Sequence, residues 1–385
     1  MSGTVTAAQD LDVAALAAQQ RIVLCCGSGG VGKTTTAAAL GCLAAEQGRR
    51  TLVMTIDPAR RLAQALKVDS LGNEPAKVAT LAGGGELHAM MLDGKRTFDA
   101  LIERYASSDA VRRTIFANHY YQHLSSSLAG SREFMALEKV YEMVDEGRFD
   151  IVIVDTPPSQ HALEFLDAPS RLFDLFEGTF VKLLMQPYRV AGRIGFDLFR
   201  RSSEAFLGVL EKLTGYQVLA DLSDFFLAFS DLFDGFKERS KTVLAMLREP
   251  TTSFLLVAAP DPASLAAADR FFARLAKDRL PLGGLVVNRV HRSAALFDAA
   301  SYALSDADAA AVASIATTDA RPLLSRLLEA HRDHVSLAAL DASAIDATAA
   351  ARAAVPTRLV RHFNRDLQDL SDVVAFAAEL ASPRS

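Results

Sequence analysis

Five short apolar runs recur along the chain and predict buried β-strands. Each run is apolar on both faces, which is typical of strands covered by helices on both sides of a parallel sheet. The runs are Arg21–Cys26, Thr51–Ile56, Ile151–Asp155, Phe254–Ala259 and Leu285–Asn288. Segments with helical spacing separate them, and the first begins at Lys33 and ends near Gln47, before Gly48. This alternation predicts a doubly wound α/β domain around a mostly parallel sheet.

Two stretches break this rhythm and predict helices alone. Residues 98–140 lack a clear strand, and residues 171–248 follow helical spacing throughout. Half of the 22 Phe residues lie between residues 171 and 240, so this stretch is an apolar helical insertion and not a linker. From Leu222 to Phe236 the aromatic side chains form a stripe along one predicted helix face. Two interpretations stay open: the packed core of a helical subdomain, or a groove for an apolar client helix.

These patterns divide the chain into three parts. Residues 1–20 form an N-terminal extension. The α/β domain is predicted to comprise residues 21–97, 141–170 and 249–385. The inserted helical subdomain is predicted to comprise residues 98–140 and 171–248, with the Phe-rich part as its surface for a client or partner.

Composition narrows the class of protein. Half of the 385 residues are apolar and the formal charge is −5, which argues against a nucleic-acid partner. We see no signal peptide and no apolar run long enough to span a bilayer, so the expected location is the cytoplasm or the periphery of a membrane. The three cysteines, Cys25, Cys26 and Cys42, form no C-x-x-C pair, which suits a reducing compartment.

A glycine-rich loop between the first strand and the first helix carries the clearest chemistry. Residues 27–34 read GSGGVGKT and fit the pattern G-x-x-x-x-G-K-[ST], a phosphate-binding loop. Glycines let backbone N–H groups turn toward phosphates, and the following helix points its positive end at the anion. We assign the nucleotide contacts to Gly27, Ser28, Gly29, Gly30, Val31, Gly32, Lys33, Thr34 and Thr35. Lys33 would reach the β- and γ-phosphates of ATP, and Thr34 would bind Mg²⁺.

Two carboxylates follow other predicted strands and complete the expected site. Asp57 comes after the second strand, where a carboxylate can polarise a water beside the γ-phosphate. Asp155 ends the strand at Ile151–Asp155, where an acid belongs that holds Mg²⁺ directly or through water. Each has the alternative interpretation of a strand-ending turn. Lys33 and Asp57 are therefore the predicted catalytic residues, and ATP and Mg²⁺ the predicted ligands.

Together these motifs resemble those of the ArsA-type ATPases. The residues that carry the resemblance are the loop, Asp57-Pro58-Ala59, and the segment from Asp155 to His161, DTPPSQH. That family includes the arsenite-pump ATPase and the guided-entry ATPase that delivers tail-anchored membrane proteins. The resemblance implies an ATP-driven dimer with a helical subdomain for clients. It also implies a second switch at Pro157, Pro158 and His161, and adenine contacts from Asn288, Val355 and Pro356.

Three departures from the family pattern change what is expected. Ser28 stands where the family usually has a Lys that reaches the phosphates of the partner subunit, and the loss of such a cation can slow hydrolysis by ~10³–10⁵. Arg60 and Arg61 are the substitutes that the sequence offers. Gln160 replaces a Gly of the second switch. No cysteine matches the family's arsenite-binding or zinc-binding positions, so arsenite transport is not expected.

Two leading hypotheses remain. The first is an ATPase whose dimer closes on ATP and handles a hydrophobic client or a membrane partner. The second is a catalytically weak nucleotide-binding subunit that regulates an active paralogue in a heterodimer, which Ser28 favours. A partition ATPase would need a basic C-terminal helix, but the segment Asp366–Leu380 is acidic. A GTPase would need N-K-x-D, but Asn288 is followed by RVH.

Overall fold

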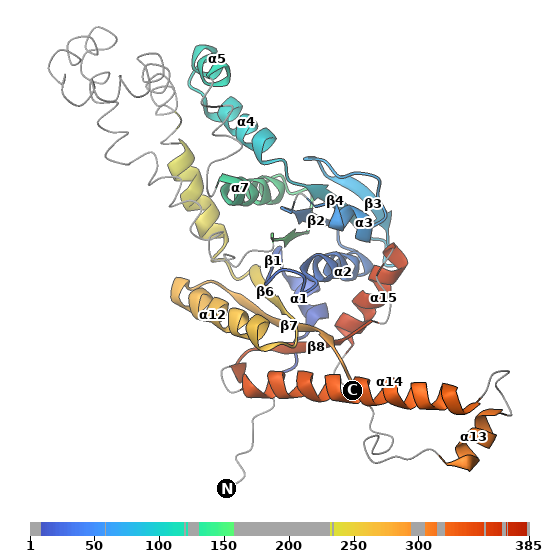
Figure 1. Ribbon diagram of the computed structural model, residues 1–385. Coiled ribbons are helices and arrows are strands. Elements are labelled where there is room, and N and C mark those ends of the chain that lie inside the picture. Colours follow the sequence, from blue (N-terminus) through green and yellow to red (C-terminus); the bar gives the residue numbers. More distant parts are fainter. Residues whose placement is uncertain are drawn as a thin grey trace, which may run out of the picture.

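A computed structural model places one eight-stranded sheet at the centre of the chain (Figure 1). The structure describes residues 9–57, 59–118, 121, 131–157, 232, 235–293, 305–313, 320–349, 352–363, 367 and 369–382. The strand order is β3-β4-β2-β5-β1-β6-β7-β8. All neighbouring strands are parallel except β3 and β4. The predicted doubly wound, mostly parallel α/β fold is confirmed.

The five predicted strands are all present and occupy the middle of this sheet. They are β1 (Ile22–Cys26), β2 (Thr51–Thr55), β5 (Ile151–Asp155), β6 (Thr252–Ala258) and β7 (Leu282–Val290). Every residue of β1, β2, β5 and β6 is buried. Helices therefore cover both faces, as the apolar runs predicted.

Three strands were not predicted, because each of them includes half-buried or exposed positions. They are β3 (Ala76–Thr80), β4 (Glu86–Met91) and β8 (Thr357–Arg361). The two edge strands, β3 and β8, end the sheet on opposite sides, and β3 is half-buried at most. An edge strand needs one apolar face or none, so its pattern is weaker than that of a central strand.

Two layers of helices cover the sheet. One face packs against α1 (Val13–Gln19), α2 (Lys33–Glu46), α3 (Arg61–Ala65) and α15 (Leu370–Ala381). The other face packs against α7 (Ser131–Asp145), the helical residues 235–246 and α12 (Pro262–Asp278). Neighbouring cysteines illustrate the alternation, because Cys25 lies in the first layer of the core and Cys26 in the second.

Further helices lie away from the sheet. Two of them, α4 (Gly94–Tyr105) and α5 (Asp109–Ala117), extend upward from the β4 side in Figure 1. They and α7 account for most of the described residues between 98 and 140. Because α4 begins before residue 98 and α7 ends after residue 140, neither predicted boundary coincides with the end of a helix. The division into domains stays a prediction.

Only the end of the Phe-rich stretch lies among the described residues. Phe236 is buried, and its ring lies 6.0 Å from that of Phe98 and 6.3 Å from that of Phe134, measured between centroids. Leu232 is also buried. These two residues are therefore packed core, in line with the first of the two interpretations. The rest of the aromatic stripe lies outside the described residues.

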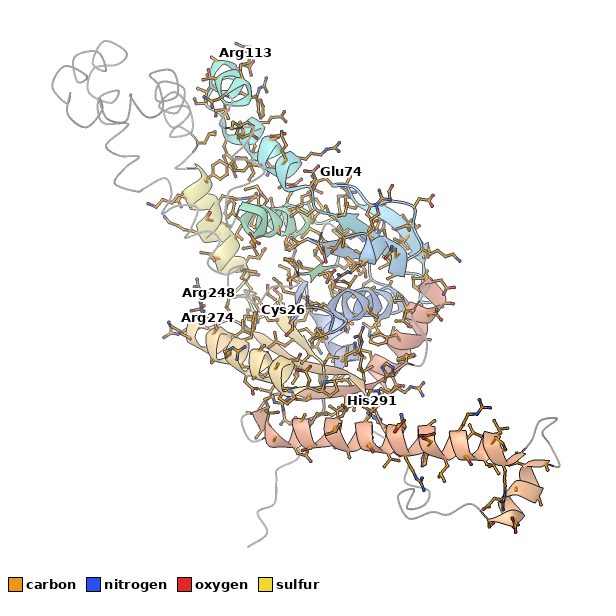
Figure 2. All side chains as sticks on the ribbon, viewed as in Figure 1. Cys26, Glu74, Arg113, Arg248, Arg274 and His291 are labelled. Atoms are coloured by element: carbon orange, nitrogen blue, oxygen red, sulfur yellow. The ribbon has the colours of Figure 1, made fainter. Side chains whose placement is uncertain are left out.

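A long helix crosses beyond the β8 edge of the sheet. This helix, α14 (Ala320–Ala347), follows α13 (Asp306–Ala313), and Figure 1 shows it running past the body of the domain. The side chain of Asp341 ties it to the end of β7, because one carboxylate oxygen lies 2.8 Å from the backbone nitrogen of His291 and 2.9 Å from its ring nitrogen. Figure 2 shows His291 beside this helix. None of the described helices is long and apolar enough to cross a membrane.

Candidate functional site

The glycine-rich loop lies where β1 ends and α2 begins, and two of its glycines have no substitute. Gly27 has φ 151°, and a Cβ atom there would lie 2.0 Å from the carbonyl oxygen of Val257. Gly32 has φ 97°, and its Cβ would lie 2.2 Å from the side-chain nitrogen of Asn288. Only glycine combines these dihedral angles with such close approaches. The loop is therefore shaped by the backbone of β6 and by the Asn288 side chain of β7.

Lys33 is turned back onto the loop. Its side chain is 6% exposed, and its Nζ donates a hydrogen bond of 2.7 Å to the carbonyl oxygen of Ser28. Burial lowers the pKa of Lys33, while the nearby carboxylate of Asp155 opposes that shift. An ammonium group held against a carbonyl oxygen is ready to exchange that oxygen for one of a phosphate group. The loop lysine is thus placed for the role predicted from the motif.

Asp155 forms a buried polar cluster with two threonines. Its Oδ2 accepts hydrogen bonds from Thr34 Oγ1 at 2.8 Å and from Thr55 Oγ1 at 2.9 Å. Its Oδ1 is buried and has no hydrogen-bond donor among the described residues. Burial raises the pKa of this carboxyl group, and the two threonine hydroxyls and Lys33 oppose the shift.

These groups fit a magnesium ion. Hydroxyl and carboxylate oxygens are the ligands that Mg²⁺ prefers, and a buried carboxylate oxygen without a partner needs a cation or a water. Thr34 and Asp155 meet although 121 residues separate them in sequence. The predicted metal ligands therefore lie together. Thr55, which holds Asp155 from the neighbouring strand, was not predicted, because a Thr inside an apolar run carries no distinguishing pattern.

Asp57 lies at the edge of the same site, and its carboxylate already has partners from neighbouring residues. Its Oδ1 accepts a hydrogen bond of 3.0 Å from the backbone nitrogen of Ala59. Its Oδ2 lies 3.8 Å from Nη1 of Arg61, the first residue of α3. Lys33, Thr34, Asp57 and Arg61 line one cavity of 340 Å³. The carboxylate borders the phosphate site, but its oxygens are engaged within its own turn.

The segment after Asp155 is described only at its start. Thr156 donates from its hydroxyl to the carbonyl oxygen of Cys25 at 2.8 Å, so the segment begins tied to β1. Pro157 follows and is half-buried. Pro158 and His161 lie outside the described residues, as does Pro58 beside Asp57. Their predicted switch roles stay predictions.

Asn288 links the loop to β7. Its side chain is 4% exposed, and its Nδ2 donates a hydrogen bond of 2.9 Å to the carbonyl oxygen of Val31. With Gly32 and Thr35 it lines a cavity of 490 Å³. The cavity is also lined by Arg361, His362, Phe363 and Leu367. An apolar ring beside a buried amide suits a nucleotide base.

The structure does not bring Val355 and Pro356 to this cavity. Both residues come before β8, where Pro356 accepts a hydrogen bond from the backbone nitrogen of Leu285 and Val355 packs in the core. The loop that leaves β8 lines the cavity instead. The prediction placed these residues on the wrong side of β8, because the strand itself was missed. Ligands bind beyond the carboxyl ends of parallel strands, so the segment after β8 and not the one before it can reach the base.

A third cavity opens along the outer side of the loop. It measures 890 Å³ and lies between Gly27, Ser28 and Gly29 on one side and α12 on the other. Gly29 and Gly30 are exposed, and Ser28 is half-buried. The outer side of the loop is therefore open to solvent in one subunit.

Comparison with known proteins agrees with this geometry. The sequence profile of the anion-transporting ATPases matches residues 20–296, which is more than half of the chain. The chain belongs to this family. The resemblance inferred from the motifs is thereby confirmed, and the chain is an ATPase of the ArsA type.

Individual relatives are identical to this ATPase at about a quarter of the aligned positions. ATPase ASNA1 homolog 1 of Paramecium tetraurelia is 27% identical over 272 residues, which cover 69% of this chain and 73% of the relative. ATPase GET3 of Podospora anserina is 27% identical over 264 residues, covering 69% and 71%. ATPase BagA of Mycobacterium tuberculosis is 28% identical over 164 residues, covering 41% and 48%.

Proposed function

We propose that this ATPase is a nucleotide-driven dimeric switch that handles a hydrophobic client or a membrane partner. Membership of the ArsA-type family supports an ATP-driven cycle. The observation that carries the proposal is the exposure of the loop: Gly29 and Gly30 are exposed, and Gly30 lines both the outer cavity of 890 Å³ and the cavity of 340 Å³ at Lys33 and Asp57. Phosphate transfer to water needs a site from which bulk solvent is excluded. A second subunit placed over the loop would close the site.

The chemistry of one subunit follows from its own residues. The loop N–H groups and Lys33 would bind the phosphates, and Thr34 and Asp155 would hold Mg²⁺, which would neutralise phosphate charge. Asp57 would position and polarise the attacking water once its carboxylate leaves the turn with Ala59 and the contact with Arg61. Because these local contacts must be exchanged, hydrolysis requires a rearrangement of the segment after β2. Closure of the dimer would supply it.

The decisive experiment measures mass in solution. The full-length Asp57→Asn variant should bind ATP and Mg²⁺ but hydrolyse slowly, so it should accumulate in the closed state. Light scattering is expected to report a mass near twice 41.4 kDa with ATP and Mg²⁺, and a lower mass with ADP. Lys33→Ala, which cannot hold the γ-phosphate, should give the same mass with either nucleotide. A mass that does not depend on the nucleotide in either variant would refute the switch.

Client binding has a separate test. In the ATP-trapped Asp57→Asn form, the protein should keep a peptide of about 20 apolar residues, the length of a membrane span, in solution. The Lys33→Ala variant should let the same peptide precipitate. Equal precipitation with both variants would remove the client from the proposal and leave the ATPase cycle intact. Fractionation would show whether the protein is cytoplasmic or also peripheral at a membrane, as proposed from its composition.

A specific residue favours a second candidate, the catalytically weak subunit of a heterodimer. Ser28 has no charge with which to reach a partner's phosphate, although it lies at the open side of the loop. Purification from the native cell with ATP and Mg²⁺ would then yield a one-to-one complex with a second ATPase. Ser28→Lys should raise the turnover of the homodimer. A fast wild-type homodimer would exclude this alternative.

A further inference from the structure

Arg289 occupies a central place among the cavities around the loop. It follows Asn288 in β7, and among the described residues it alone lines all three cavities: the one at Lys33 and Asp57, the one at Asn288, and the one beside Ser28. The nucleotide must pass through the region that these cavities share, because the first holds the phosphates and the second the base. Arg289 therefore lies beside the path that joins the base to the γ-phosphate.

The backbone of Arg289 has an unfavourable conformation. Its φ is 64°, in the left-handed region that residues other than glycine rarely adopt. Its backbone nitrogen donates a hydrogen bond of 2.9 Å to Oδ1 of Asn288, whose Nδ2 donates to the carbonyl oxygen of Val31. One buried amide thus connects Arg289 to the phosphate loop. Strained backbone that surrounding contacts maintain is concentrated at functional sites.

The charge of Arg289 is available to a ligand. The residue is exposed, and no carboxylate within the described residues forms an ion pair with it. Other arginines near the sheet differ in this respect, since Arg352 pairs with Asp269, Arg358 with Asp10 and Arg361 with Glu379. The pKa of His362, which also lines the base cavity, is lowered first by partial desolvation, then by the charge of His291 and then by that of Arg289.

We propose that Arg289 contacts the phosphate chain of the bound nucleotide and supplies, within the same subunit, a cation at the loop that carries Ser28. A guanidinium group presents several donors in a fixed fork and binds phosphate oxygens in pairs, which a serine hydroxyl cannot do. The strained backbone aims this group into the site before the nucleotide arrives. The inference rests on the proposed nucleotide function, because it assigns a role toward the same ligand.

The chain contains a matched control for the test. Arg279, at the end of α12, is also an exposed arginine with a left-handed backbone, at φ 56°, but it lines none of the three cavities. Replacing either residue with glycine relieves the same backbone strain and removes the same charge. Both Arg289→Gly and Arg279→Gly should therefore melt at the wild-type temperature or above it without nucleotide. Only Arg289→Gly should change ligand binding.

Binding is measured on the full-length protein with ATP, ADP and adenosine as probes. Arg289→Gly is expected to weaken ATP and ADP binding about tenfold, the order expected for one charge-assisted hydrogen bond. Adenosine binding should stay unchanged, because adenosine carries no phosphate. Arg279→Gly should bind all three probes as the wild type does. Arg289→Lys should recover part of the affinity for ATP, since it restores the charge but not the fork.

The outcomes separate this inference from the broader proposal. Unchanged ATP affinity in Arg289→Gly would overturn the phosphate contact while leaving ATP binding by the wild type established. An equal loss for ATP and adenosine would also overturn it, because the residue would then shape the base cavity and not contact phosphate. A wild type that fails to bind ATP would overturn both. Weaker binding of ATP and ADP alone, with partial recovery by lysine, supports the assignment.

Discussion

The two halves of the nucleotide site are built in different ways. The phosphate half lies at the ends of the central strands β1, β2 and β5, where Lys33 and Asp155 are buried and Asp155 accepts hydrogen bonds from Thr34 and Thr55. The base half lies toward the β8 edge, where Arg361 and His362 are exposed. Asn288 links the two halves, because it is buried, lines the base cavity and donates a hydrogen bond to the carbonyl oxygen of Val31 in the loop.

This difference separates a pre-organised region from an adjustable one. Buried polar groups in the phosphate half have few alternative partners, so their positions are set before a nucleotide binds. Exposed groups in the base half lose less when they move, because water replaces a missing contact. We therefore expect substitutions in the phosphate half to affect hydrolysis most, and those in the base half to affect affinity and pH dependence.

The largest expected effect is on hydrolysis in Lys33→Ala. Removing the cation that faces the transferred phosphate should lower kcat by about 10²–10³-fold, the usual loss for one pre-organised group that stabilises developing charge. Lys139 is an equally buried lysine in α7, paired with Glu142 at 3.2 Å, and provides the control. Lys139→Ala should lower the melting temperature but keep kcat within a few-fold. Comparable turnover in both variants would contradict the assigned role of Lys33.

The next largest effect is expected for Asp155→Asn, which should lower the rate of hydrolysis but raise the stability of the fold. Asp155→Asn removes a metal ligand and should lower the Mg²⁺-dependent rate about 100-fold. Burial raises the pKa of Asp155, so its ionised form costs stability as pH rises above the unfolded-state pKa. The variant should therefore unfold at a higher temperature than the wild type at pH 7.5 without Mg²⁺. A lower melting temperature and an unchanged Mg²⁺ requirement would contradict the metal assignment.

A smaller effect is expected where the halves meet, at Asn288. Asn288→Ala removes the hydrogen bonds to Val31 and Arg289 and should destabilise the fold by about 1–3 kcal/mol. ATP affinity should fall about tenfold, since the loop and β7 are no longer joined. Asn73→Ala, at a surface turn where the side chain accepts from the backbone of Asp93, is the control and should leave affinity unchanged. Urea unfolding and titration with ATP measure both quantities.

The smallest effect concerns pH and His362. Partial desolvation and the charges of His291 and Arg289 lower the pKa of His362 in the folded state. The unfolded chain then binds the proton more readily, so stability present above pH 6.5 is lost as pH falls below it. His362→Gln should lose less stability than the wild type between pH 7.5 and pH 5.5 in urea titrations. An identical loss would show that His362 is not responsible.

The sequence predicted the phosphate half more completely than the base half. Lys33, Thr34 and Asp155 were identified because each belongs to a short motif at the end of a run apolar on both faces. Thr55, Arg289 and the loop after β8 were missed. The contacts of Thr55 and Arg289 depend on strands that are distant in sequence, and the edge strand β8 has a weak pattern. That missed strand also explains why Val355 and Pro356 were assigned to the base.

By itself, the sequence determined the local chemistry of this ATPase: the glycines that the loop requires, the alternation of strand and helix, and the buried runs that form the centre of the sheet. These depend on neighbouring residues, whose preferences are read directly from the chain. Only the tertiary structure decided which distant groups meet. It brought Asp155 within hydrogen-bonding distance of Thr34 and Thr55, and Asn288 within hydrogen-bonding distance of Val31. It also placed Arg289 in the lining of all three cavities. The reason is that strand order and register, which set these distances, follow from packing across the whole sheet.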